Sequence, residues 1–133
     1  MKMKEIVIGS SAETTTIVNS TKTASSVGSG TLPVFGTTFM IALMEKATTN
    51  AVVDFLENDE TTVGTGIHVS HVKASGIGSV VTALAVVKEV EGRKITFDVV
   101  AKDNDEEIIG KGTIERFVVN ETKFMEKVKT DEI

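Results

Sequence analysis

Glu45 is the residue whose position most clearly invites chemistry. It directly follows an apolar run at 39–44, in a segment whose composition predicts a buried helix. Burying a carboxylate is costly unless the carboxylate is paired or hydrogen-bonded. Two interpretations stay open. Glu45 marks one solvated edge of the helix beside Lys46, or it is a positioned base or nucleophile.

The two histidines can be separated by the alternation of side chains along a strand. Odd-numbered positions over 63–71 are mostly apolar and end at His71, whereas His68 shares the even positions with Gly64 and Gly66. We therefore expect His71 to face the interior and His68 to face the other side. His71 is then either a satisfied core residue or a proton-transfer group, since its ordinary pKa of ~6.5 lies near neutrality.

Thr37 stands where the helix is expected to begin. Backbone N–H groups at a helix start lack partners, so the default role of Thr37 or Thr38 is to cap them. Gly64 and Gly66, inside a predicted strand, indicate either a bulge or a close approach of the backbone to a ligand.

Composition excludes several classes of function. A net charge of −5 without a basic stripe argues against nucleic acid as a partner. The absence of cysteine rules out disulfides, thiolate metal sites and cysteine nucleophiles. Two histidines without metal-ligand spacing predict no metal site. No segment predicts a signal peptide or a membrane span, so we expect a cytoplasmic protein that does not enter a membrane.

One long helix followed by four strands would position these residues. The helix is predicted at about 38–56, and it is apolar on every side over its first turns, which is typical of a buried helix. A strand or broken hairpin and a loop rich in small residues precede it, and a short helix ends the chain. The predicted ranges are 4–18 for the first strand, 20–32 for the loop, 61–73, 79–90, 93–102 and 107–119 for the four strands, and 121–129 for the last helix.

A helix that is apolar all round needs cover on most of its circumference. One curled antiparallel sheet wrapped around a long central helix provides that cover economically. The order of elements therefore predicts an α+β fold of the hot-dog type, in a single domain over 1–133.

Three segments, with their spacing kept, resemble the fluoroacetyl-CoA thioesterase family. They are VFGTTFMIALME at 34–45, GTGIHVSH at 64–71 and GKGTIER at 110–116, and the hairpin at 90–93 adds to them. The resemblance covers roughly 33–128. It implies a hot-dog homodimer with active sites at the subunit interface, which hydrolyses a short acyl-CoA thioester without metal or cofactor.

The resemblance also assigns roles to residues. The family's catalytic threonine, glutamate and histidine fall on Thr37, Glu45 and His71, and its substrate-contacting glycine and arginine fall on Gly64 and Arg116. Strand alternation places Gly64 and His71 on opposite faces. A bulge, or a contribution from the other subunit, is needed to bring them to one pocket.

One departure from the family concerns the acyl group. The fluoroacetyl-specific enzyme carries phenylalanines in the segment before the helix, whereas this chain has Gly-Ser-Gly-Thr at 28–31. We therefore do not expect fluoroacetyl-CoA itself to be the substrate. Two other functions stay open: a hot-dog hydratase acting on an enoyl-CoA, and a non-catalytic module that binds an acyl-CoA or another small molecule.

Overall fold

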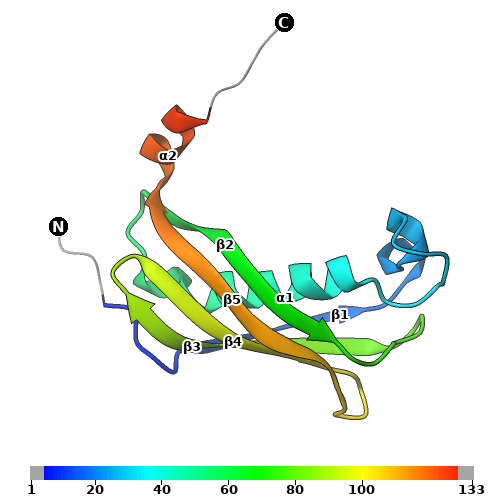
Figure 1. Ribbon diagram of the computed structural model, residues 1–133. Coiled ribbons are helices and arrows are strands. Elements are labelled where there is room, and N and C mark those ends of the chain that lie inside the picture. Colours follow the sequence, from blue (N-terminus) through cyan, green and yellow to red (C-terminus); the bar gives the residue numbers. More distant parts are fainter. Residues whose placement is uncertain (1–4, 129–133) are drawn as a thin grey trace, which may run out of the picture.

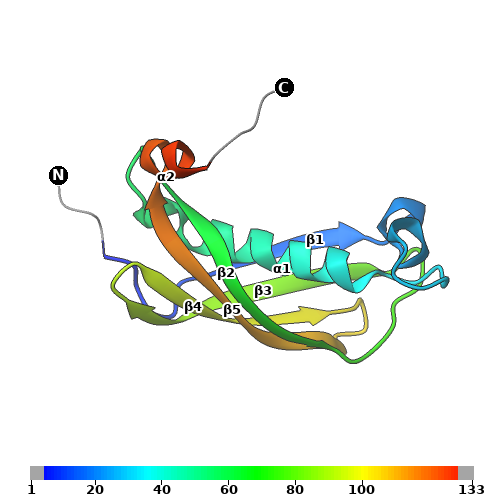
Figure 2. The same ribbon diagram turned by 45° about the horizontal axis from the view of Figure 1, so that its top comes forward.

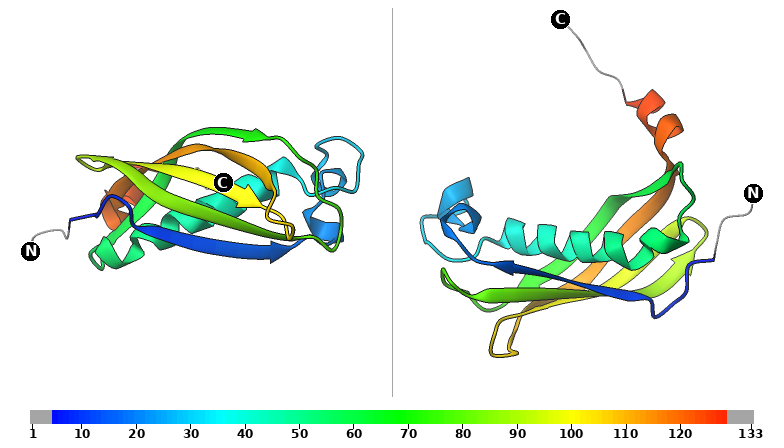
Figure 3. Two further views of the ribbon diagram at one scale, coloured as in Figure 1. Left: turned by 90° about the horizontal axis from the view of Figure 1, so that it is seen from below. Right: turned by 180° about the vertical axis from the view of Figure 1, so that it is seen from behind.

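The computed structural model describes residues 5–128 and consists of one curled sheet, one long helix and a short helix at its end (Figure 1). The long helix α1 lies across the concave face of the sheet (Figure 3, right panel). The elements are β1 (Ser11–Ile17), α1 (Thr37–Val52), β2 (Glu60–His71), β3 (Val80–Glu91), β4 (Lys94–Lys102), β5 (Ile108–Asn120) and α2 (Glu121–Lys127). Short 3₁₀ turns lie at Ser20–Lys22, Ser25–Val27 and Val53–Phe55.

All strand pairs in the sheet are antiparallel, and the order is β1-β3-β4-β5-β2. Tight turns join β3 to β4 at Gly92 and β4 to β5 at Glu106, and both residues have positive φ. The strand β2 pairs with β5 instead of its successor β3, so β2 forms one edge of the sheet. This edge matters for the site, because β2 carries Gly64 and His71.

The core lies between α1 and the concave face of the sheet. Alternate residues of β3 and β4 are buried and meet one face of the helix. Met40, Met44, Ile95 and Phe97 are among the fully buried side chains. The opposite side of the helix is open, so the prediction of a helix buried all round is wrong for the single chain. One sheet covers only one side of a helix.

The predicted start and end of the helix also need correction. Gly36 occupies the N-cap position, and no side chain caps the helix there. Thr37 is instead the first helical residue. At the other end the α-helix stops at Val52 and continues as a 3₁₀ turn, rather than running to Leu56.

The four strands after the helix agree with the predicted ranges to within two residues. At the N-terminus only β1 forms, because the chain turns at Gly9, whose φ is +95°. The predicted loop contains two 3₁₀ turns, which lie at the opposite end of the molecule from α2 (Figures 1 and 2). Asn120 caps α2, and the final position of the predicted helix, 129, lies outside the described residues. None of the helices within 5–128 is long and apolar enough to cross a membrane.

Candidate active site

Thr37 and His71 lie side by side at the start of α1. Thr37 is the first residue of the helix and His71 is the last residue of β2. Oγ1 of Thr37 lies 2.7 Å from Nδ1 of His71. In the tautomer that carries its proton on Nδ1, this nitrogen donates a hydrogen bond to the hydroxyl oxygen, and Nε2 is left as the acceptor nitrogen of the ring. The pair therefore couples a hydroxyl group to a base.

The imidazole of His71 is partly buried, and its Nε2 has no hydrogen-bond partner within residues 5–128. Burial lowers the pKa of His71 below its ordinary value, because the charged ring loses solvation, and the nearby backbone of Lys73 raises it by a smaller amount. His71 is therefore neutral at pH 7. A neutral ring with an unpaired nitrogen can take up a proton.

The segment after His71 is fixed to the turn between β4 and β5. Lys73 forms an ion pair with Asp103 at 2.8 Å and another with Glu107. The hydrogen bond from Lys73 lowers the pKa of Asp103, and the two carboxylates raise the pKa of Lys73. This double pair holds the end of β2 in place and so helps to fix the orientation of the histidine.

Glu45 and Arg116 form a second cluster, between the middle of α1 and β5. Nη1 of Arg116 lies 3.4 Å from Oε2 of Glu45. Thr62 holds the guanidinium, since Nε donates to its Oγ1 at 2.8 Å and Nη2 donates to its carbonyl oxygen at 3.0 Å. The side chain of Arg116 is 10% exposed and that of Glu45 is 37% exposed.

Glu45 has features of both interpretations left open for it. Its side chain is partly exposed to solvent, and its contact with Arg116 also holds it in position. Burial lowers the pKa of Arg116, and the Glu45 carboxylate opposes that shift. Arginine stays charged in proteins, because its ordinary pKa is so high. Arg116 is thus a fixed cation beside a carboxylate that still reaches solvent.

A β-bulge brings Gly64 to the face of the sheet that carries His71. The ladder between β2 and β5 shifts register between Gly64 and Gly66, so that Thr65 is an extra residue in β2. An extra residue reverses the alternation of side chains beyond it. The prediction that Gly64 and His71 lie on opposite faces is therefore wrong, and the bulge is one of the two features expected to reconcile them.

The missing side chain of Gly64 keeps space open beside the Glu45 carboxylate. A methyl group on Gly64 would lie 3.1 Å from Oε2 of Glu45 and 3.6 Å from Nη1 of Arg116. The first distance is shorter than ordinary van der Waals contact, so the carboxylate would have to move. Gly64 therefore belongs to the second cluster.

The two histidines lie on opposite faces of β2, as alternation over this stretch predicts. His71 pairs with Gly110 and faces Thr37. His68 pairs with Thr113, an odd number of positions from Gly110, so it points to the other face of the sheet, and it is exposed. His68 lines a shallow hollow on the outer face with Asp98 and Lys111. It contributes nothing to either cluster.

The two clusters are far apart within one chain. Thr37 and Glu45 are eight positions apart on α1, which corresponds to about 12 Å at 1.5 Å per residue. Gly64 and His71 are seven positions apart on β2, about 23 Å at ~3.3 Å per residue. A single thioester group cannot contact both clusters of the same chain.

A cavity of about 290 Å³ adjoins the Thr37–His71 pair. Its walls include Val34, Val72 and Ala74, together with Ser29 from the segment before the helix. Ser29 belongs to the stretch at 28–31 that lacks aromatic residues. A small residue therefore lines the cavity next to the Thr37–His71 pair.

No group of three or more His, Asp and Glu side chains is placed to hold a metal ion in the part of the chain that the structure describes. The Gly110-Lys111-Gly112 segment has a structural explanation. A methyl group on Gly110 would collide with Met40, and one on Gly112 would collide with the backbone at His68. These glycines let β2 and α1 approach β5 closely.

Comparison with known proteins shows the family to which the chain belongs. A family model described as fluoroacetyl-CoA-specific thioesterase matches residues 18–122. The fluoroacetyl-CoA thioesterase of Streptantibioticus cattleyicolor is 44% identical over 96 residues, which cover 72% of this chain and 68% of that protein. The chain belongs to the fluoroacetyl-CoA-specific thioesterase family.

Solved structures place this family member in the hot-dog fold. The crystal structure of an alanine mutant of the fluoroacetyl-CoA-specific thioesterase has a TM-score of 0.86 and 34% identity, and the match covers 94% of this chain and 96% of that one. A Thermus thermophilus protein described as a thioesterase superfamily member has a TM-score of 0.87 and 26% identity, with 93% and 91% covered. The predicted hot-dog fold and family are confirmed.

Two residues that help to build the site of this family member were not predicted from the sequence. Thr62 holds Arg116 from two directions, and Lys73 fixes the end of β2. The sequence feature that could have identified Thr62 is its position two residues before Gly64 in the same strand. No local pattern linked Lys73 to Asp103, because 30 residues separate them.

Proposed function

We propose that this protein is a thioesterase that hydrolyses a short-chain acyl-CoA thioester to the free acid and CoA. Membership of the family supports the reaction class. The contact between Thr37 and His71 at 2.7 Å carries the assignment, because it joins a hydroxyl group to a neutral base beside a cavity. The cavity of about 290 Å³ suits a small acyl group.

The working enzyme is a homodimer with its active sites at the subunit interface. The strand β2 lies at the edge of the sheet, where its outer backbone groups can pair with another strand. Antiparallel pairing of β2 with a second copy, with His71 opposite Gly64 of the partner subunit, joins the two clusters across the interface. The contact is isologous, so it creates two equal sites.

In this arrangement His71 transfers the proton. The neutral imidazole takes a proton from the attacking water, while the water oxygen bonds to the thioester carbon. When the C–S bond breaks, the imidazolium returns that proton to the thiolate of CoA, and the acyl group leaves as the carboxylic acid. Thr37 fixes the imidazole ring through Nδ1.

The second cluster positions the reacting groups. Glu45 orients the attacking water, and Arg116 holds Glu45 and contacts the acyl end of the substrate near Gly64. An attack by Glu45 itself would give a mixed anhydride. Rapid acid quenching followed by peptide mass measurement separates the two routes, because only the anhydride route acylates Glu45.

The proposal covers the whole chain, 1–133, as one domain without a metal or cofactor. CoA thioesters are made and used inside cells, so we place the enzyme in the cytoplasm. Neither nucleic acid nor a membrane is a partner in this proposal, in keeping with a net charge of −5.

Release of free thiol from acetyl-, propionyl- and butyryl-CoA tests the function. We expect catalytic turnover with at least one of them, with one free acid formed for each thiol. If crotonyl-CoA loses its enoyl absorbance and no thiol is released, the protein is a hydratase instead. Binding of acyl-CoA without any turnover would show a binding module.

A further inference from the structure

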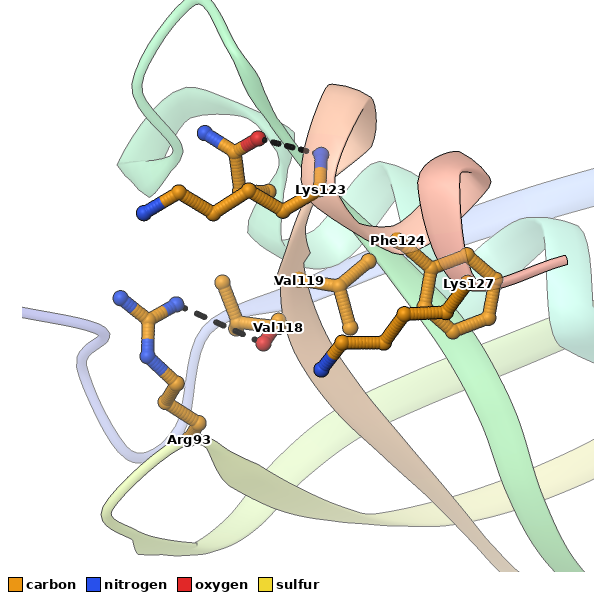
Figure 4. Close-up of a pocket in the computed structure, with 7 residues that line it drawn as sticks. Arg93, Val118, Val119, Lys123, Phe124 and Lys127 are labelled. Carbon is orange, nitrogen blue, oxygen red and sulfur yellow. Dashed lines mark hydrogen bonds between the residues drawn. The ribbon is translucent and has the colours of Figure 1, made fainter.

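A groove with three cationic side chains lies at the end of the sheet, between the β3–β4 hairpin and α2 (Figure 4). Its volume is about 310 Å³. Arg93 comes from the hairpin, whereas Lys123 and Lys127 come from α2, and all three surround the apolar floor at 118–119. Phe124 also lines the groove and is 37% exposed.

The charge of this groove is opposite to that of the protein as a whole. The chain has 19 acidic and 14 basic residues, yet no carboxylate lines the groove. Within residues 5–128, Lys123 and Lys127 form no ion pair. Arg93 uses Nη1 for Glu60, at 3.2 Å, and for the carbonyl oxygen of Val118, at 3.4 Å. A guanidinium has five N–H donors, so Nε and Nη2 of Arg93 can donate to a ligand.

We propose that this groove binds the phosphorylated nucleotide end of CoA. This inference rests on the proposed thioesterase function, which requires a CoA thioester as substrate. The two lysines and Arg93 would donate charge-assisted hydrogen bonds to the phosphates. Phe124 offers an exposed ring on which the adenine can stack.

The position of the groove along β5 fits a substrate that also reaches the Glu45 cluster. Val118 follows Arg116 by two positions and lies on the same face of the strand, about 7 Å away. Asn120, where α2 begins, is about 13 Å from Arg116 by the same measure. The pantetheine arm of CoA separates the thioester from the phosphates by a comparable length.

A double variant, Lys123→Ala with Lys127→Ala, tests the groove on two substrates. Acetyl-CoA carries the nucleotide, and acetyl-pantetheine has the same thioester without it. We expect the KM for acetyl-CoA to rise by about ten-fold or more, since each charge-assisted contact supplies roughly that factor. The kcat/KM for acetyl-pantetheine should stay unchanged. Lys88→Ala with Lys111→Ala removes the same charge from the outer face and should leave both substrates unaffected.

An unchanged KM for acetyl-CoA in the double variant would overturn the inference, and so would an equal loss for both substrates. Direct binding separates this inference from the proposed function. Calorimetry should detect adenosine 3′,5′-bisphosphate binding to the wild type, weakened in the Lys123 and Lys127 variant and by added salt. That result supports the groove even if no thioester is hydrolysed. Binding no tighter than that of inorganic phosphate would contradict it.

Discussion

The Thr37–His71 pair and the Glu45–Arg116 cluster are built in opposite ways. In the first, a neutral imidazole has one ring nitrogen bonded to a hydroxyl group and the other without a partner in residues 5–128. In the second, a buried guanidinium makes three contacts, two with Thr62 and one with Glu45. The first region is therefore suited to moving a proton, and the second is suited to holding a charge still.

This difference is the reason why, in the proposed mechanism, neither region acts as an active site alone. A proton-transfer group needs an unsatisfied atom, whereas an orienting group needs fixed bonds. The two regions lie about 12 Å apart along α1 in one chain, too far to act on one thioester. In the proposed homodimer a second copy of the chain would bring the opposite halves together, and the following changes test that division.

The largest effect is expected at His71. His71→Ala removes the proposed base and should lower kcat by about 10²–10⁴-fold, as is typical of acid–base groups. His68→Ala is the matched control, because His68 lies on the outer face of the same strand. Steady-state kinetics of both variants measure this. A larger loss for His68→Ala would show that the wrong face carries the chemistry.

The pH profile should reveal the same base. Burial disfavours the charged ring, so the folded-state pKa of His71 lies below its ordinary ~6.5 and the neutral form persists to lower pH. Below that pKa, kcat/KM should fall about ten-fold per pH unit. The unfolded chain gains the proton first, so stability should also decline as the pH falls below about 6.5. An activity limb centred well above 6.5 would contradict the assignment.

A smaller effect is expected from Gly64→Ala. The added methyl group would meet Oε2 of Glu45 at 3.1 Å and displace the carboxylate, which should lower kcat/KM by about ten-fold. Gly66→Ala is the control, because the atoms nearest to its methyl group belong to the flexible side chain of Glu115. Equal losses in the two variants would mean that the substitutions disturb β2 as a whole and not the carboxylate.

The smallest effect concerns the cavity wall. The wild type should hydrolyse acetyl-, propionyl- and butyryl-CoA with similar kcat/KM and show no strong preference for fluoroacetyl-CoA. Ser29→Phe narrows the cavity and should lower kcat/KM for butyryl-CoA several-fold more than for acetyl-CoA. Thr31→Phe is the control, because Thr31 does not line the cavity, and it should leave kcat/KM unchanged for both substrates. A several-thousand-fold preference of the wild type for fluoroacetyl-CoA would place the discrimination in the two clusters instead.

Much of the fold could be predicted from sequence because its signals are local. The runs of β-branched residues predicted the four strands after the helix, and the apolar run at 39–44 predicted α1. The position of β2 beside β5 could not be predicted. Pairing order depends on contacts between distant segments, and no turn residue marks it.

The arrangement of the candidate site could likewise be predicted only where its signals are local. The alternation of side chains along the strand correctly predicted that His71 and His68 lie on opposite faces, because that stretch of β2 is regular. Alternation failed at Gly64, because one extra residue at Thr65 reverses the faces. The pairing of Thr37 with His71, rather than a role in capping, also depends on two elements meeting in space.

Subunit mixing tests the central claim most directly. His71→Ala and Glu45→Gln chains should each be inactive, and light scattering should show each to be a dimer. After the two are unfolded and refolded together, half of the random dimers are mixed, and each mixed dimer holds one intact site. Activity should therefore return to about one quarter of the wild-type value. A mixture as inactive as its parents, with mixed dimers shown to be present, would mean that both residues act from the same chain and would contradict the account.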